Sequence, residues 1–197
     1  SATRLDGALD PDRVRDALRR LVERHEALRT TFTLRDGAVR QRVADAVAAA
    51  ELPLTFTRAD LPAPAGDPEA GIDAVMADFV RPFDLEAGPL FRMEVVDGGE
   101  QGSLLLFDIH HIVADATSVE VLTRDFSALY AGELAPLALQ YTDYVHHATG
   151  AEAEQALAEG TAAVAATLTD APSGDVVAPD HARGARTPAA GRVALRL

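Results

Sequence analysis

Residues 90–116 read LFRMEVVDGGEQGSLLLFDIHHIVADA, and this stretch sets the architecture of the chain. It contains two apolar runs, Leu90–Val96 and Ser103–Ile109, separated by a glycine-rich segment. Two such runs around a short glycine-containing segment are typical of a β-hairpin. A helix is predicted to begin at about Thr117. The pair His110-His111 is therefore expected where a buried strand leaves the sheet, just before the next helix.

Upstream of this hairpin the sequence predicts a helix and three strands. Asp10-Pro11 is typical of a helix start, because Asp caps free backbone N–H groups and Pro has none to satisfy. The apolar residues that follow recur at helical spacing, and they are Val14, Ala17, Leu18, Leu21 and Val22. Asp36-Gly37 is typical of a tight turn between strands Arg29–Leu34 and Ala38–Val43, and Leu54–Thr57 is a short strand.

The remaining elements are helical. A second helix is predicted to open at Asp67-Pro68 and to stop at Pro82, and one or two alanine-rich helices are predicted within 140–167. The order from the first helix to the one near Thr117 is α-β-β-β-α-β-β-α. This order favours a mixed α/β (α+β) fold in which helices pack on a largely antiparallel sheet.

The composition argues against several classes of protein. Among 197 residues there are 18 Lys and Arg and 31 Asp and Glu, giving a net charge of −13. Nucleic acids and anionic membrane surfaces both need clustered cations, so neither is an expected partner. The absence of cysteine excludes disulfides and thiolate chemistry. No apolar run approaches the roughly 18 residues of a membrane helix and no signal peptide is evident, so a cytoplasmic location is expected.

The two adjacent histidines are the first candidates for chemistry. Strand alternation places Leu105, Phe107, Ile109 and His111 on one face and Leu104, Leu106, Asp108 and His110 on the other. Only one histidine is then expected to serve a given site. Asp115 follows near the start of the next helix, where it caps that helix, orients the loop or pairs with an arginine. A metal site is not expected, because it needs about three or four ligands and the spacing offers too few.

A second candidate is the segment RHEALRTTF, Arg24–Phe32. One interpretation is a solvated helix end that runs into a strand, where positive charge is favourable in any case. The other interpretation is that Arg24 or Arg29 is buried and neutralises Asp115, and of the two we favour Arg24. In that pair Asp115 is expected to be ionised, with a lowered pKa, and not to act as a base.

Several segments, in order, resemble the condensation domains of nonribosomal peptide synthetases. Arg24–Phe32 is similar to the family's Arg-His-Glu-x-Leu-Arg-Thr-x-Phe motif, and Pro82–Arg92 (PFDLEAGPLFR) to its Phe-Asp-Leu…Pro-Leu-x-Arg stretch. His110–Ala116 resembles the His-His-x-x-x-Asp-Gly signature, and Gln140–Val145 (QYTDYV) the Tyr-x-Asp-Tyr-Ala segment. The tail from Pro179 resembles the family's crossover loop. Together these segments extend over nearly the whole chain.

The resemblance implies a lobe of the chloramphenicol-acetyltransferase-like fold. It implies residues 1–169 as the N-terminal lobe and 170–197 as the crossover loop and first strand leading to an absent C-terminal lobe. The implied active site is a tunnel between two lobes, in which carrier-bound donor and acceptor thioesters meet and form an amide. The substrates would arrive on the phosphopantetheine arms of donor and acceptor peptidyl carrier proteins, with no cofactor bound by the chain itself.

The resemblance also assigns roles to single residues. His111 corresponds to the catalytic second histidine, and Asp115 to the structural acid that pairs with an arginine. His110, Ala116, Arg24 and Arg29 belong to the same motifs. Ala116 departs from the pattern, because it stands where the family has glycine; a glycine needed for positive φ would make this change harmful. His146-His147 stands where the family has tryptophan, and two exposed or half-buried helix histidines are expected there.

Three other functions remain open on the sequence. Some relatives recruit partner enzymes, although those usually lose the histidine motif that is intact here. Epimerisation domains share the motif. A free-standing acyltransferase of the same superfamily would use a soluble acceptor. A heterocyclising domain is disfavoured, because it has aspartate in place of the first histidine, His110.

Overall fold

The computed structural model describes residues 1–45, 52–59, 61 and 70–171, in two compact units that comprise Ser1–Ala148 and Thr149–Leu197. The predicted helix start at Asp67-Pro68 and the predicted crossover loop and strand, from residue 172 onward, lie outside the described residues. No described helix has both the length and the apolar character that a membrane span requires. The lobe boundary at residue 169 stays a prediction.

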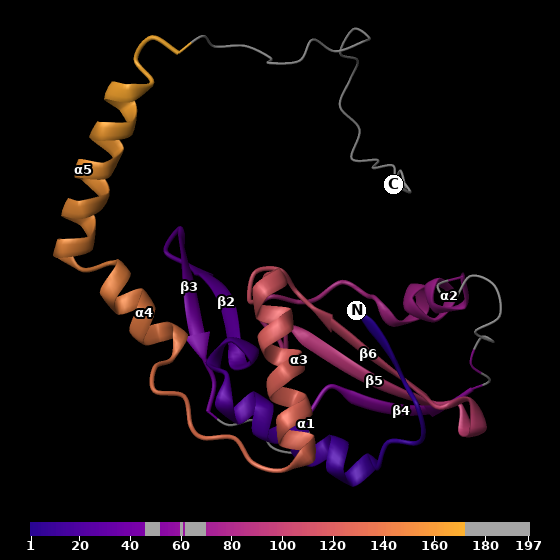
Figure 1. Cartoon of the computed structure of the whole chain (residues 1–197). Coiled ribbons are helices and arrows are strands. Elements are labelled where there is room, and N and C mark those ends of the chain that lie inside the picture. Colours follow the sequence, from indigo (N-terminus) through magenta and orange to yellow (C-terminus); the bar gives the residue numbers. More distant parts are fainter. Residues whose placement is uncertain (46–51, 60, 62–69, 172–197) are drawn as a thin grey trace, which may run out of the picture. The chain divides into compact units, whose positions relative to one another are not determined.

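A four-stranded sheet forms the centre of the first unit (Figure 1), with strand order β1-β6-β5-β4. The hairpin strands are β5 (Phe91–Asp97) and β6 (Ser103–Ile109), which pair antiparallel, whereas β4 (Leu54–Arg58) pairs parallel with β5. The sheet is therefore mixed and largely antiparallel, as predicted. The outer strand β1 (Ala2–Leu5), antiparallel to β6, was not among the predicted elements.

Strands β2 (Thr30–Arg35) and β3 (Ala38–Val43) form a separate two-stranded sheet. Asp36 and Gly37 join them with φ angles of 52° and 75°. Two positive φ angles match the twist of the flanking strands, so the predicted tight turn is confirmed. Strand β2 follows a 3₁₀ turn at Glu26–Arg29, so it starts one residue later than predicted.

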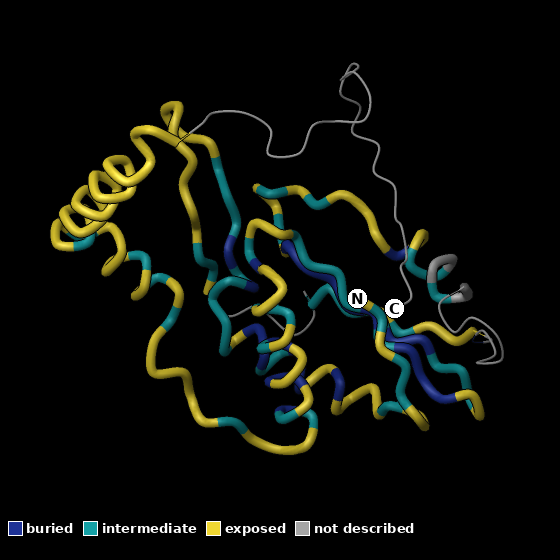
Figure 2. Tube along the Cα trace, turned by 45° about the horizontal axis from the view of Figure 1, so that its top comes forward, coloured by how far each residue is buried: buried dark blue, intermediate teal, exposed yellow. Residues whose placement is uncertain are grey.

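Helices cover both faces of the central sheet. On one face α1 (Pro11–Arg24) and α3 (Ala116–Ala131) share a core with alternate residues of β5 and with Leu105, Phe107 and Ile109 of β6. On the other face α2 (Ala70–Phe79) packs over Val96, Leu104 and Leu106. The predicted alternation of faces along β6 is thus confirmed. Figure 2 shows the buried residues concentrated in these strands and in the helix faces turned toward them.

Two more helices follow α3. Helix α4 (Tyr141–Ala148) ends the first unit, and it contains no buried residue. Helix α5 (Ala151–Thr167) belongs to the second unit and is exposed along nearly all of its length. Both lie within the range 140–167, where one or two helices were predicted, and the structure has two.

Candidate functional site

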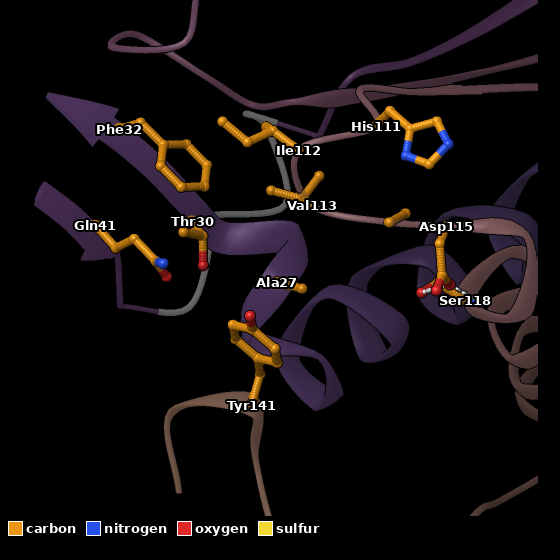
Figure 3. Close-up of a pocket in the computed structure, with 11 residues that line it drawn as sticks. Ala27, Thr30, Phe32, Gln41, His111, Ile112, Val113, Asp115, Ser118 and Tyr141 are labelled. Carbon is orange, nitrogen blue, oxygen red and sulfur yellow. Dashed lines mark hydrogen bonds between the residues drawn. The ribbon is translucent and has the colours of Figure 1, made fainter. Parts of the chain in front are cut away.

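A cavity of about 300 Å³ lies beside the histidine motif (Figure 3). Its walls come from the 3₁₀ turn, strands β2 and β3, the loop after β6, and the starts of α3 and α4. The lining residues with polar or aromatic side chains are Thr30, Phe32, Gln41, His111, Asp115, Ser118 and Tyr141. Three of the four motif segments quoted above thus meet at one cavity.

His111 lies at the end of this cavity that also holds Asp115 (Figure 3), and its side chain is exposed. Strand β6 ends at Ile109, so His111 sits in the turn that leads to α3. No hydrogen bond to its ring is formed by the part of the chain that the structure describes. An accessible imidazole that no such hydrogen bond holds has the freedom that a general base needs.

His110 has different surroundings, as the strand alternation predicts. Its ring packs against Phe83, with the ring centroids 6.0 Å apart at 78°. Its Nδ1 accepts a hydrogen bond of 3.0 Å from the backbone N–H of Ile112. Accepting through Nδ1 leaves the ring proton of the neutral form on Nε2. His110 is therefore engaged in holding the turn that carries His111.

Asp115 caps α3, and its expected pairing with an arginine is wrong in this structure. Its Oδ1 accepts hydrogen bonds from the backbone N–H of Ser118 at 2.8 Å and from the Ser118 hydroxyl at 2.6 Å. These bonds from Ser118 hold the pKa of Asp115 below its usual range. The predicted lowering of the pKa is thus confirmed, but its cause is helix capping. An ionised, capped carboxylate is not poised to act as a base.

Arg24 pairs with a different acid. Its Nε lies 2.8 Å from Oδ2 of Asp125 in α3, whose side chain is only 1% exposed. His25 Nε2 lies 3.0 Å from the same oxygen, and Arg124 Nη2 lies 2.9 Å from Oδ1. Arg24 Nη1 also donates to the carbonyl of Ala135. Arg24 therefore joins α1 to α3 and does not neutralise Asp115.

Two pKa values change in this buried cluster. Burial raises the pKa of Asp125, but the hydrogen bonds from Arg24, Arg124 and His25 outweigh burial and lower the pKa overall. Burial lowers the pKa of His25. The Asp125 carboxylate raises it by less, so the pKa of His25 stays below its usual value. The cluster thus contains an ionised aspartate and a histidine that resists protonation.

Arg29 binds backbone carbonyls and no carboxylate within the described ranges. Its Nε donates to Val22 O at 3.0 Å, Nη2 lies 3.5 Å from Glu23 O, and Nη1 donates to Ala44 O. Val22 and Glu23 lie in the last turn of α1, where free carbonyls favour a cation. Arg29 therefore caps the end of α1 and attaches the chain that follows β3, and its expected role beside Asp115 is also wrong.

The two departures from the family motifs have plain structural settings. Ala116 is the first residue of α3 and its φ is not positive, so this position does not require glycine. His146 and His147 are exposed on α4, as expected. Among the described residues, no group of three or more His, Cys, Asp or Glu side chains is arranged to hold a metal ion.

Some cavity residues were not singled out from the sequence. Thr30, Phe32 and Tyr141 lie inside quoted motifs, but no role was assigned to them. Tyr141 could have been singled out from the sequence. It is an aromatic residue near a motif aspartate on a helix with little apolar content, and aromatic side chains are uncommon on such a surface. Gln41 offered no signal, since it sits in an exposed strand and reaches the cavity only through the pairing of β3 with β2.

Polar contacts fix the helix that carries Tyr141. Gln140 Nε2 donates to Arg24 O at 2.9 Å, and Thr142 Oγ1 donates to Glu26 Oε2 at 2.6 Å. The first and last motifs of the sequence are thus linked directly, across more than one hundred residues. This link sets the position of the cavity wall opposite the histidine turn.

Comparison with known sequences assigns this arrangement to a family. Residues 1–162 match the sequence profile of the family described as Condensation domain. Tyrocidine synthase 3 of Brevibacillus parabrevis is 43% identical over 141 residues, which are 71% of this chain and 2% of the relative. Surfactin synthase subunit 1 of Bacillus subtilis (strain 168) is 39% identical over 142 residues, 72% of this chain and 4% of the relative.

Solved structures show the same fold. The X-domain from teicoplanin biosynthesis is 34% identical, with a TM-score of 0.63, over 81% of this chain and 33% of that one. The epimerization domain of tyrocidine synthetase B is 23% identical, with a TM-score of 0.72, over 92% and 42% of the respective chains, and this likeness concerns the fold alone. The chain therefore spans less than half of the solved chains that it resembles.

Proposed function

The chain belongs to the condensation-domain family, and from this premise we propose that it is the N-terminal lobe of a domain that forms amide bonds in nonribosomal peptide synthesis. The donor is an acyl or peptidyl thioester on one carrier protein, and the acceptor is an aminoacyl thioester on another. The acceptor amine attacks the donor carbonyl, the new C–N bond forms, and the donor thiol leaves. Phosphopantetheine arms deliver both substrates, and the chain itself holds no cofactor.

The observation that carries this proposal is the setting of His111. Its imidazole is exposed at a cavity, on a turn held by His110, and it is not engaged in a hydrogen bond with the described part of the chain. A neutral imidazole accepts the proton of the attacking amine or stabilises the tetrahedral intermediate. Holding both tethered substrates in line supplies a large part of the acceleration, because two reactants become effectively one.

The roles of the neighbouring residues follow from their contacts. His110 supports the turn, and Asp115 caps α3 through Ser118, so neither is assigned a proton-transfer step. Thr30, Phe32 and Tyr141 shape the wall opposite the turn. The second wall of the tunnel is proposed to come from a C-terminal lobe of the same domain. This part of the proposal is supported by the share of the solved relatives that the chain spans.

The test is amide formation by the full-length protein that contains this chain, with both substrates loaded on carrier proteins. His111→Ala is expected to lower the rate by about 10²–10⁴-fold, the usual contribution of a general base. His147→Ala is the matched control, since it removes an exposed imidazole on α4. A His111→Ala variant with wild-type turnover would contradict the proposal, provided that the wild type and the control are active.

A recruiting function is the second candidate, because the X-domain from teicoplanin biosynthesis has been solved in complex with OxyB, and that X-domain is 32% identical to this chain with a TM-score of 0.66. The intact His110, His111 and Asp115 favour catalysis over recruitment. The two functions differ in one measurable respect: a recruiting domain binds a partner enzyme and leaves the acyl group on its carrier, whether or not His111 is present.

A further inference from the structure

A buried cation lies beneath the histidine turn and outside the cavity. Arg92 in β5 is 9% exposed and pairs in register with Asp108 of β6. Arg92 Nε lies 3.5 Å from Asp108 Oδ2. That oxygen is the one buried side-chain polar atom of the described chain that lacks a hydrogen bond. A buried charge of this kind is costly unless it is compensated, so Arg92 and Asp108 depend on each other.

The same guanidinium ties a third segment to the sheet. Arg92 Nη2 donates to Arg81 O at 2.6 Å, and Nη1 donates to Phe79 O at 3.3 Å. Phe79 ends α2, and Arg81 begins the stretch that leads to Phe83. The planar, multiply donating guanidinium makes these contacts at once, which a lysine ammonium at this position does not reproduce. Arg92 therefore fixes the segment after α2 against the end of the hairpin.

An aromatic ring connects this clamp to the motif. Arg92 Cζ lies 3.9 Å from the centroid of the Phe83 ring, and Phe83 in turn packs on the ring of His110. The backbone of His110 is held as well, because its N–H donates to Leu90 O at 2.9 Å. His110 then receives the Ile112 N–H, which lies directly after His111. A continuous set of contacts runs from Arg92 to the turn that carries His111.

We propose that Arg92 is a positioning residue for His111: through Asp108 and Phe83 it fixes His110, and His110 fixes the turn. The inference rests on the proposed role of His111. Arg92 touches no part of the cavity, so it is assigned no contact with either substrate. Its loss is expected to misplace the imidazole and leave substrate binding intact. A small misplacement of a catalytic group lowers the rate strongly, by about 10²-fold for roughly 1 Å.

The experiment compares Arg92→Gln and Phe83→Leu in the full-length protein with Arg58→Gln as the matched control. Arg58 of β4 pairs in register with Asp97 at the other end of β5, so it is also an arginine opposite an aspartate in this sheet. Unlike that of Arg92, its side chain is 81% exposed. Two quantities are measured: kcat and KM for amide formation, and hydrogen exchange of the peptide that contains Ile112, followed by mass spectrometry.

The expected result for Arg92→Gln is a kcat lowered by about 10²-fold with KM unchanged. Its Ile112 peptide exchanges faster, while peptides of α1 keep their wild-type exchange. Phe83→Leu shifts both quantities in the same direction, and Phe83→Tyr, which keeps the ring, restores them. Arg58→Gln matches the wild type. Phe83→Leu keeps the Arg92–Asp108 pair, so it tests the relay even where Arg92→Gln disturbs folding.

Two outcomes would overturn the inference. One is wild-type kcat and wild-type exchange at Ile112 in Phe83→Leu. The other is a higher KM with unchanged kcat in Arg92→Gln, which indicates a binding role. Failure of the proposed function has a different signature, since the wild type then forms no amide; the exchange measurement still decides whether Arg92 and Phe83 hold the turn.

Discussion

At the start of α3, Oδ1 of Asp115 accepts two hydrogen bonds from Ser118. Asp115→Ala is expected to lower the melting temperature because it removes a helix cap, and Asp115→Ser is expected to keep most of the stability because serine is also a strong capping residue. Thermal unfolding followed by circular dichroism checks this. Equal losses for both variants would indicate that the charge, and not the cap, stabilises the helix.

Asp125 is the acid that Arg24 requires. Asp125→Ala is expected to cost about 3–5 kcal/mol of unfolding free energy, because it leaves the guanidinium of Arg24, whose side chain is 13% exposed, without its partner. Asp12→Ala is the control: Asp12 pairs with Arg15 at the surface, where its side chain is 94% exposed, and its loss should cost under about 1 kcal/mol. Similar losses of unfolding free energy in chemical denaturation would show that the Asp125 cluster stabilises the fold no more than a surface ion pair does.

The contrast between Asp115 and Asp125 shows where sequence reasoning reached its limit. From the sequence, Asp115 could either cap α3 or pair with an arginine. The residues around Asp115 do not determine whether an arginine about ninety residues away lies next to it. A signal for Asp125 did exist. It follows Leu122 by three positions and precedes Leu129 by four, so it lies on the apolar face of its own helix, where a charge calls for a buried partner.

Helices α1 and α3 meet at a pH-sensitive contact. The pKa of His25 is lowered in the folded protein, chiefly by burial, and the charged groups that face it are Arg24, Arg124 and Asp125. Below the ordinary histidine pKa of about 6.5, the unfolded chain therefore binds a proton that folded His25 does not. The unfolding free energy therefore falls as the pH drops from about 6.5 toward the pKa of His25 in the folded protein.

His25→Gln tests this dependence, because a glutamine amide donates to Asp125 but does not titrate. The unfolding free energy of the variant is expected to decline less than that of the wild type between pH 7 and pH 5. Chemical denaturation at several pH values measures the difference. Parallel pH curves for the two proteins would contradict the assignment of the titrating group to His25.

At the scale of elements, segments with an apolar pattern or a turn signal were predictable, the short strand β4 included, whereas strand β1 was not. The hairpin of β5 and β6 and the helices α1 and α3 carry apolar patterns that determine their buried faces. Strand β1 has only four residues, and its place is set by pairing with β6. Gly102 permits that approach, since its φ is 86° and an added Cβ would lie 2.3 Å from Leu5 O. Such a contact between distant segments leaves no periodic signal.

At the scale of the whole molecule, a second lobe is proposed to lie opposite the cavity that this chain lines. The isolated 197-residue chain is expected to form no amide, because neither phosphopantetheine arm would be enclosed on both sides. An assay with carrier-bound donor and acceptor checks this. Turnover by the isolated chain would contradict the two-lobed arrangement and would favour a self-contained acyltransferase.

Transfer of an acyl group from one carrier protein to another is tested most directly by the intact masses of both carrier proteins. With the full-length protein, we expect the acceptor carrier to gain the mass of the donor acyl group while the donor carrier returns to its free thiol form. This transfer should be lost in His111→Ala and kept in His147→Ala. An acceptor carrier of unchanged mass, with wild-type protein and both substrates loaded, would contradict the account.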